Sequence, residues 1–331
     1  MYQRERRVRY QVTEVPFLPY GIGDDNIIFG YERGENIFTA EGVLFDYNDG
    51  GLQKISFGGI AARNSNGVMS VYDGGFDWDA RYGFVMLHPD GRAVDLKGVF
   101  WEPWRMFRGE NRFGAAHSLN GEVAVGHSHW VADYDGDEED YLQASYWSVA
   151  TGKGCPLKTM ESLESTAYHL NRRGVVVGVI GGTVYYWPHG RPAVWEHVEA
   201  EPSVLEAPNS AEARFINEKG DVIAGTHLYD GRHKAACVWL RGEFVDLETL
   251  GGAESGPLAM NSRGVVVGYS DMHPRGCHAW ILREDVADLN EEIPKDSGWE
   301  LVMATGINDA GLIVGLGVKD GSDKGFILLP I

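Results

Sequence analysis

Short apolar runs separated by glycine-containing polar turns dominate the chain, and one such phrase recurs. The segment MNSRGVVVGYS (260–270) joins an Asn-x-x-Gly step to a valine run that ends in glycine. Its counterparts are IGDDNIIFGYE (22–32), RNSNGVMSVYD (63–73), LNGEVAVGHSH (119–129), LNRRGVVVGVI (170–180), INEKGDVIAGT (216–226) and INDAGLIVGLG (307–317). Self-similarity at a regular spacing indicates a repeat architecture in which each unit is one supersecondary structure.

The seven copies of this phrase share an anchor position, the residue seven after the turn Asn or its equivalent (six in the short third copy). The anchors lie near Gly30, Val71, Gly126, Gly178, Ala224, Gly268 and Gly315. Their interval averages about 47 residues, which matches the roughly 40–50 residues of a propeller blade.

Each unit contains further apolar runs of strand length. A second run follows every phrase, as in CHAWIL (277–282), and a third follows six of them, as in DVADLN (285–290). With the run before the Asn, one unit therefore contains four strands of roughly 4–7 residues. The Asn-x-x-Gly step predicts a tight turn between the first two strands, because Gly and Asn tolerate positive φ. No helical stripe competes with this pattern, which indicates an all-β chain.

The two ends of the chain complement each other. The seventh unit lacks its third run, and a matching run, VRYQVTEVPF (8–17), precedes the first turn phrase. We therefore predict a single domain over residues 1–331, a seven-bladed β-propeller of four-stranded blades. A strand at about 8–17 completes the last blade and closes the ring, which removes exposed sheet edges. The alternative, an open β-solenoid of seven repeats, would have no use for the displaced strand.

The C-terminal units resemble a known repeat family. The segment CVWLRGEFVDLETLGGAESGPLAMNSRGVVVGYS (237–270), followed by CHAWILREDVADLN (277–290), is similar to the HAF-type repeat of bacterial proteins. The likeness is good over about 165–331 and weak over 19–150. It implies a propeller-like fold and no defined activity, because the family has no shared catalytic motif to carry over. Many HAF-like proteins look exported, whereas this chain shows no secretory signal.

Composition narrows the classes of partner. The chain has 44 glycines among 331 residues, which fits many tight turns, and a formal net charge of −19. That charge argues against binding to nucleic acid or to an anionic membrane surface, since both need a basic footprint. No apolar run reaches the ~18 residues of a membrane span. With no CxxC spacing, Cys155, Cys237 and Cys277 are expected to be free thiols of a cytoplasmic protein, or of an exported one if a signal has been removed.

The propeller topology predicts where a site would lie. The tight Asn-turns belong to one face, and the long connections gather on the opposite rim. These connections are 73–81, 97–113, 127–143, 226–234 and 269–276. Loops on a rigid scaffold commonly carry function.

Acid–base and ligand-binding candidates follow the second strands on that rim. The catalytic candidates are His127, His129, His227 and Tyr269, because histidine titrates near neutral pH and tyrosine can donate a proton. Their ligand-binding companions are Tyr31, Tyr72 and Asp271. The alternative is that each side chain only caps its own blade, since equivalent positions of different blades fan apart.

The loop WEPWRMFRGENR (101–112) is the preferred ligand region. It combines tryptophan with arginine, which binds carboxylates through two N–H groups and stacks on rings. The candidates there are Trp101, Trp104, Arg105 and Arg108. A solvated loop fixed to its neighbours by tryptophan is the alternative.

A second tier of candidates lies on the first strands. His117, Tyr168, His169 and Arg214 precede Asn-turns and could face the axis of the ring. Strand alternation assigns half of such positions to packing between blades instead.

One acidic loop suggests a metal. Asp133, Asp135 and Asp137 stand at alternate positions, as in a calcium loop. The glycine falls at the fourth place rather than the sixth, and the twelfth place holds no glutamate, which favours a solvated loop. No cofactor is expected, with calcium as the exception that this loop leaves open.

Two functions fit these features. The first is a binding module that recognises a small molecule or a partner protein on its loop-rich face. The alternative is a cytoplasmic enzyme of small-metabolite biosynthesis, a hydrolase, lyase or cyclase, with His or Tyr as acid/base and Arg as an anion clamp. Propellers host both, so the fold does not decide between them.

Overall fold

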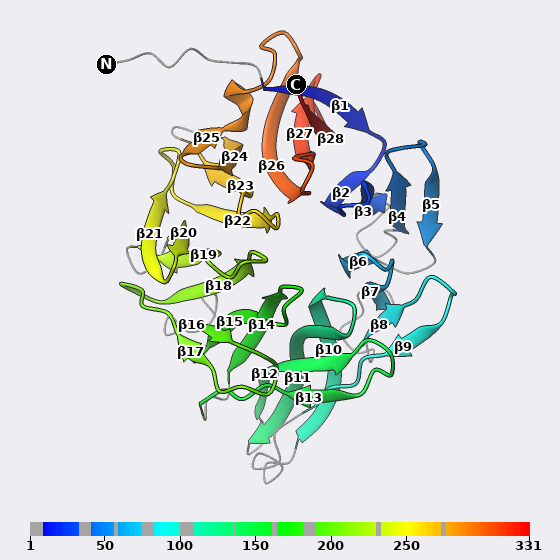
Figure 1. The fold of residues 1–331 in the computed structure, drawn as a ribbon, viewed down its shortest axis with the longest axis vertical. Coiled ribbons are helices and arrows are strands. Elements are labelled where there is room, and N and C mark those ends of the chain that lie inside the picture. Colours follow the sequence, from blue (N-terminus) through cyan, green and yellow to red (C-terminus); the bar gives the residue numbers. More distant parts are fainter. Residues whose placement is uncertain are drawn as a thin grey trace.

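A computed structural model of the chain describes residues 9–32, 41–55, 59–73, 83–99, 109–134, 137–160, 164–181, 190–229, 233–272 and 276–331. These residues form seven four-stranded antiparallel sheets, so the protein is a seven-bladed β-propeller (Figure 1). Among them, no helix is long and apolar enough to cross a membrane.

The blades follow the order of the chain. Blade 1 contains β2 (Leu18–Ile22), β3 (Ile27–Glu32), β4 (Glu41–Asp46) and β5 (Leu52–Ile55); blade 2 contains β6 (Gly59–Arg63), β7 (Met69–Asp73), β8 (Gly83–Leu87) and β9 (Ala93–Asp95); blade 3 contains β10 (Gly109–Leu119), β11 (Val123–Tyr134), β12 (Asp137–Ser148) and β13 (Gly154–Pro156). The fourth blade contains β14 (Ser165–Leu170), β15 (Val176–Ile180), β16 (Arg191–Trp195) and β17 (Ser203–Val204); the fifth contains β18 (Ala211–Ile216), β19 (Val222–Leu228), β20 (Lys234–Leu240) and β21 (Glu243–Glu248).

The last two blades complete the ring. Blade 6 contains β22 (Ser255–Met260), β23 (Val266–Asp271), β24 (Cys277–Leu282) and β25 (Val286–Asp288), and the short 3-10 helix η3 (Leu289–Glu291) follows it. Blade 7 contains β26 (Trp299–Ile307), β27 (Ile313–Lys319), β28 (Ser322–Pro330) and the N-terminal strand β1 (Tyr10–Val15). The strand predicted at 8–17 thus closes the ring, with Tyr10 opposite Pro330 and Val15 opposite Gly325.

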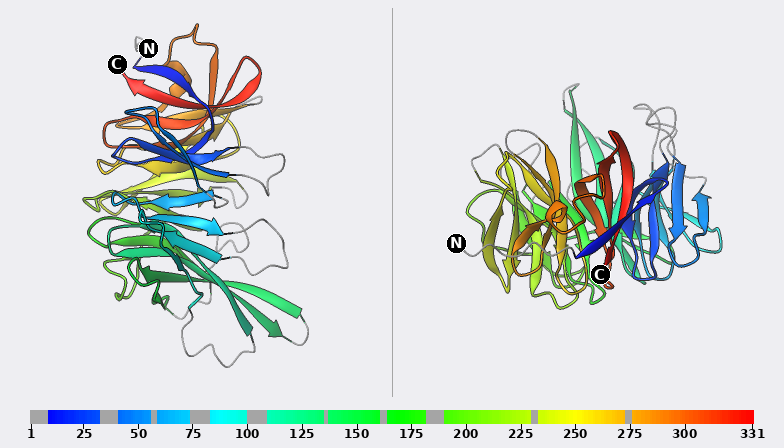
Figure 2. Two further views of the ribbon diagram at one scale, coloured as in Figure 1. Left: turned by 90° about the vertical axis from the view of Figure 1, so that its right-hand side faces the viewer. Right: turned by 90° about the horizontal axis from the view of Figure 1, so that it is seen from above.

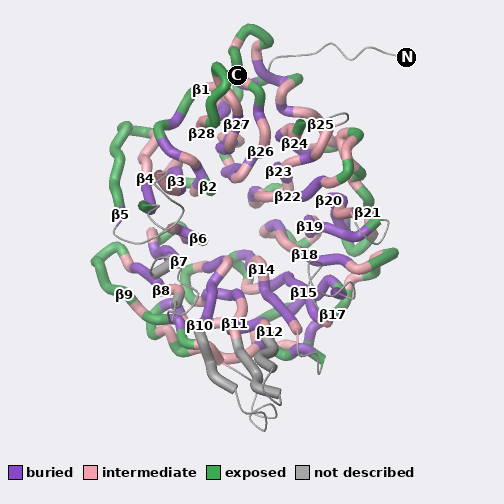
Figure 3. Tube along the Cα trace, turned by 180° about the vertical axis from the view of Figure 1, so that it is seen from behind, coloured by how far each residue is buried: buried purple, intermediate pink, exposed green. Residues whose placement is uncertain are grey.

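The core is divided among the junctions between blades. Seven hydrophobic clusters occur in the described part of the chain, and each joins two neighbouring blades. In one of them Trp147 of blade 3 packs with Met86 of blade 2, and both side chains are fully buried. The buried segments accordingly follow the inner strands, and exposed segments follow the outer ones (Figure 3). Burial between blades, rather than around the axis, provides the apolar stabilisation of the ring.

The recurring asparagine holds its own turn and the next blade together. The carboxamide oxygen of Asn171 accepts hydrogen bonds from the N–H groups of Arg173 and Val175, at 3.0 and 3.1 Å. The NH2 group of Asn171 donates to the carbonyl oxygen of Asn217 in blade 5, at 3.1 Å. Asn261 makes the corresponding contacts between blades 6 and 7. Buried amides satisfied in this way explain why the phrase keeps its Asn.

The recurring glycine has a steric cause. A Cβ atom added to Gly178 would collide with the carbonyl oxygen of Thr166 on β14, and one added to Gly268 would collide with that of Gly256 on β22. The first strand approaches so closely because it bulges at this point. In blade 5 the turn is one residue longer, with the N–H of Asn217 bonded to Val222, so the equivalent glycine is Gly225 and not the expected Ala224.

Candidate functional site

Every first strand carries a β-bulge three residues before its turn begins. A bulge places an extra residue on one strand and redirects its side chain. The bulged residues of blades 1 to 7 are Tyr20, Ala61, His117, Tyr168, Arg214, Leu258 and Thr305. Because the first strands surround the centre of the ring, these residues form one set around its axis, the bulge ring (Figure 1).

The bulge ring lines an axial pocket of about 930 Å³. The pocket extends from the bulges to the Asn-turns and opens among them, and all seven bulged residues contribute to its wall. A concave site of this size suits a small organic molecule. The sequence placed the site on the opposite rim. Each of the rim connections includes residues that lie outside the described ranges, so that part stays a prediction.

One side of the pocket is polar. His117, Tyr168 and Arg214 come from the consecutive blades 3, 4 and 5. The guanidinium of Arg214 lies over the ring of Tyr168, 4.7 Å from its centroid. Its Nη2 pairs with Oε2 of Glu212 at 2.7 Å, and the Glu212 side chain is fully buried. Stacking and a buried carboxylate together hold the guanidinium in a fixed orientation.

His117 begins a line of imidazoles that leads away from the pocket. Its Nε2 lies 2.8 Å from Nδ1 of His127 on β11, so one ring donates a hydrogen bond to the other. His129 follows two residues later on the same side of β11. Burial, and then the charges of His117 and His129, hold the pKa of His127 well below its ordinary value. Burial, and then the charge of Arg214, lowers the pKa of His117 to about 4. His117 is therefore a neutral imidazole at neutral pH.

His169 stands beside the bulge and also lines the pocket. Its Nδ1 is buried and has no hydrogen-bond partner among the residues that the structure describes. Its ring packs against Phe215, with centroids 5.8 Å apart, and burial lowers its pKa to about 4. His169 is therefore a neutral imidazole at neutral pH.

The other side of the pocket is largely apolar or small. Blades 6 and 2 contribute Leu258 and Ala61, and Phe29 lies nearby on β3. The hydroxyl of Thr305 donates to the carbonyl oxygen of Pro19 at 2.9 Å, which joins blades 7 and 1. The pocket is thus amphipathic, with hydrogen-bonding groups on blades 3 to 5 facing a mainly apolar wall.

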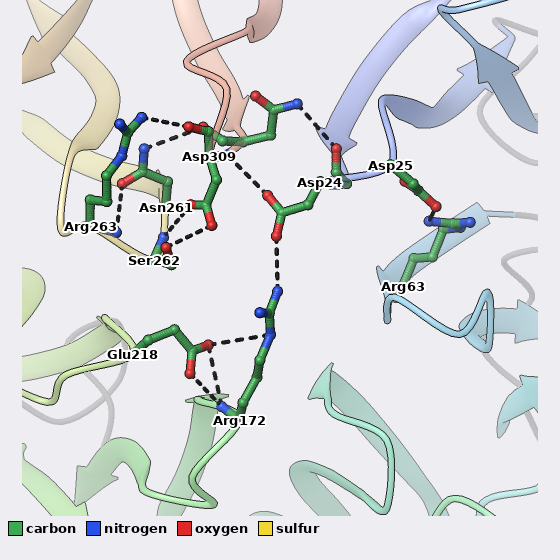
Figure 4. Close-up of polar contacts among 11 residues, drawn as sticks. Asp24, Asp25, Arg63, Arg172, Glu218, Asn261, Ser262, Arg263 and Asp309 are labelled. Atoms are coloured by element: carbon green, nitrogen blue, oxygen red, sulfur yellow. Dashed lines mark hydrogen bonds and ion pairs between the residues drawn. The ribbon is translucent and has the colours of Figure 1, made fainter.

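Charged residues of the Asn-turns surround the mouth of the pocket (Figure 4). Arg172 of blade 4 reaches across to Asp24 of blade 1, with Nη2 2.9 Å from Oδ2, and it also pairs with Glu218. Asp309 receives hydrogen bonds from the N–H and hydroxyl groups of Ser262. Five carboxylates and two arginines belong to the mouth, so its balance is acidic.

The structure does not bring the four catalytic candidates together. His127 and His129 lie on β11, His227 on β19 and Tyr269 on β23, which are the second strands of three different blades. His227 is buried, with Nε2 3.2 Å from Oδ1 of Asp246. Equivalent positions fan apart here because the blades radiate from the axis. One of the four, His127, shares a hydrogen bond with a pocket residue, His117.

Of the remaining rim candidates whose side chains the structure describes, Tyr31 and Asp271 do not line the axial pocket. Tyr31 and Asp271 are half-buried at the ends of β3 and β23, and the backbone of Tyr72 lies in β7. The tryptophan–arginine loop candidates lie outside the described residues: Trp101, Trp104, Arg105 and Arg108.

The acidic loop is only partly described. Asp133 and Asp137 are strand residues of β11 and β12, which project from the ring as a long hairpin (Figure 2), and Asp135 lies beyond the described residues. Within the described ranges no group of three His, Cys, Asp or Glu side chains could hold a metal ion. The calcium pattern therefore stays a sequence-based prediction.

The second-tier candidates are the ones that converge. His117, His169 and Arg214 all line the pocket, together with Tyr168. Sequence reasoning overlooked Tyr20, Thr305 and the buried partner Glu212. A usable signal was present for the first two, since the third residue before each turn is a bulged residue in every blade.

Comparisons with known proteins agree with this fold. No protein-family model and no curated protein matches the sequence. A solved oligogalacturonate lyase in complex with manganese is similar in structure at 11% identity, with a TM-score of 0.57 over 97% of this chain and 91% of that chain. Puromycin hydrolase is similar at 12% identity, with a TM-score of 0.55 over 96% of this chain and 52% of that chain. TolB from Acinetobacter baumannii matches at 10% identity, with a TM-score of 0.47 over 93% of this chain and 65% of that chain. This chain therefore spans less than two thirds of the length of TolB. These identities show a shared fold alone, and the resemblance to HAF-type repeats stays a sequence-based prediction.

Proposed function

We propose that the protein is a binding module whose axial pocket takes a small molecule with a single carboxylate and an apolar body. The observation that carries this proposal is Arg214. The buried carboxylate of Glu212 and the ring of Tyr168 hold its guanidinium in the pocket wall. A guanidinium oriented in advance binds a carboxylate through parallel hydrogen bonds with little loss of conformational entropy.

The rest of the pocket limits the ligand. The acidic mouth disfavours polyanions, because each additional negative charge would meet the carboxylates of Asp24, Glu218 and their neighbours. Ala61 of blade 2 and Phe29 of blade 1 offer an apolar surface across the pocket from Arg214, and Leu258 of the neighbouring blade 6 adds to it. A compact monocarboxylate with a ring-like body meets both conditions.

The test is a titration with benzoate, followed by calorimetry or by ligand-observed NMR. The variant to compare is the double substitution Arg214→Gln with Glu212→Gln, which removes both charges of the pair and leaves no buried ion uncompensated. We expect it to lose roughly tenfold or more in affinity. Arg191→Ala, an exposed arginine on β16, is the matched control and should bind as the parent does. Equal binding by the double variant would overturn the proposal.

The loop-rich rim stays a second place for a small molecule or a protein partner, as the sequence predicts.

A further inference from the structure

The polar wall of the pocket holds more than an anion site needs. A carboxylate would be held by Arg214 alone, yet blade 3 adds His117 and, behind it, His127. Imidazoles in series are costly to bury without a purpose, because each has two nitrogens that require partners. This line of imidazoles is the feature from which the inference starts.

The contact between the two rings constrains their tautomers. Nε2 of His117 is engaged with Nδ1 of His127, which leaves Nδ1 of His117 for the pocket that this residue lines. If Nε2 carries the shared proton, Nδ1 is a bare lone pair and can act as a base. A proton accepted at Nδ1 can then be balanced by passage of the Nε2 proton to Nδ1 of His127.

We infer that the axial pocket is a general-base site, in which His117 removes a proton from the carbon next to a carboxylate that Arg214 holds. In this step the C–H bond breaks and its electron pair stays on the substrate, where it delocalises into the carboxylate paired with the guanidinium. The proton bonds to Nδ1 of His117, and the Nε2 proton moves to His127. The substrate class is therefore carboxylic acids with an acidic α-hydrogen, and the inference rests on the proposed binding function.

The charges around His117 support this role. Burial, and then the charge of Arg214, lowers the pKa of His117 to about 4. The free site is therefore kept in its neutral, proton-accepting form. A carboxylate bound to Arg214 offsets the charge of the guanidinium, and this raises the proton affinity of His117 only when substrate is present. Base strength would thus be coupled to occupancy, as efficient proton transfer requires.

His127 acts through His117 and is a positioning residue. Its role is to hold the tautomer of His117 and to receive the relayed proton. His127→Gln retains a hydrogen-bonding group, whereas His127→Phe does not. Because Gln can hold the tautomer of His117 but cannot take up the relayed proton, we expect the Gln variant to keep part of the activity and the Phe variant to keep less.

The experiment uses a substrate that needs a base and no carboxylate site. 5-Nitrobenzisoxazole loses its C3 proton to a base while its N–O bond breaks, and it yields a coloured cyanonitrophenolate. We expect the protein to accelerate this elimination and His117→Ala to reduce the rate at least tenfold, within the range of general-base effects. The rate should be flat between about pH 5.5 and 8, whereas an ordinary histidine would titrate near 6.5.

Each outcome decides something. A rate equal to that of buffer, or an unchanged rate in His117→Ala, would overturn the inference while leaving the benzoate titration to judge the binding proposal. A rate that survives His117→Ala but falls in an exposed-histidine control, His197→Ala, would assign the base elsewhere. Circular dichroism of each variant separates loss of the base from loss of the fold.

Discussion

Two sets of equivalent positions, only a few residues apart in each unit, follow opposite rules. In the first set, the turn residue is Asn in six of the seven blades, and the residue facing the bulge is Gly in six. In the second, the bulge ring, the seven residues include aromatic, basic, apolar and hydroxyl side chains. The uniform set fixes the backbone, and the side chains that this backbone presents to the axis are then free to differ.

The largest expected effect comes from the uniform set. Gly178→Val would drive a side chain into the carbonyl oxygen of Thr166, so we expect a loss of about 4 kcal/mol in unfolding free energy or failure to fold. Gly174→Asn is the control, since the φ of 83° at Gly174 suits Asn and an added Cβ atom would meet no other atom within 4 Å. Urea unfolding measures both. A Val variant as stable as the parent would contradict the steric reason for the glycine.

The next effect belongs to the bulge ring and concerns charge. Arg214→Ala leaves the buried carboxylate of Glu212 without its guanidinium, and we expect a loss of about 2–3 kcal/mol. Adding Glu212→Gln should recover at least half of that loss. Urea unfolding of the single and double variants gives the coupling between the two sites. Additive effects would show that the pair is not a unit.

A somewhat smaller effect depends on pH. The folded pKa of His169 is about 4, below its unfolded value of about 6.5, so the unfolded state binds the proton first as pH falls. Stability is therefore lost between about pH 6.5 and 4, by about 2 kcal/mol between pH 7 and 5. His169→Gln should remove this share of the loss, whereas the exposed His197→Gln should not. If the unfolding free energies of His169→Gln and the parent depend on pH in the same way, His169 is not the source of the loss.

The smallest effect is expected from one of the turn asparagines that link neighbouring blades. Asn171→Ala removes two turn hydrogen bonds and the one to Asn217, at a net cost of about 1–2 kcal/mol, because water reaches part of the turn. The exposed Asn209 provides a control whose replacement should change unfolding by less than about 0.5 kcal/mol. If both variants have the same unfolding free energy, the hydrogen bonds of the turn asparagine do not stabilise the ring.

The same division explains what the sequence could predict. The blade number, the strands and the closing strand were predictable, because steric and hydrogen-bonding demands repeat with the unit and leave Asn and Gly at fixed spacing. The position Ala224 was one residue off because a turn insertion is invisible without knowledge of which residue the N–H of Asn217 bonds.

The candidate site was less predictable for a different reason. Strand alternation places Tyr168 and His169 on opposite sides, yet both line the pocket, because the bulge interrupts the alternation. No propensity marks a bulge in a single unit. Only alignment of the seven units shows that the third residue before each turn is special. Glu212, fully buried, gave no sign at all, since an isolated carboxylate in a strand usually indicates exposure.

The bulge also has an evolutionary consequence. A residue of the bulge ring can be exchanged without disturbing the hydrophobic clusters between blades. Each blade therefore contributes one position around the axis that can change independently of the other six. After duplication of such a gene, copies could diverge in what they recognise through single substitutions, most safely at bulge positions that have no buried ionic partner. Selection for a new ligand would then change mainly the residues at these seven positions, while the rest of each repeat changed little.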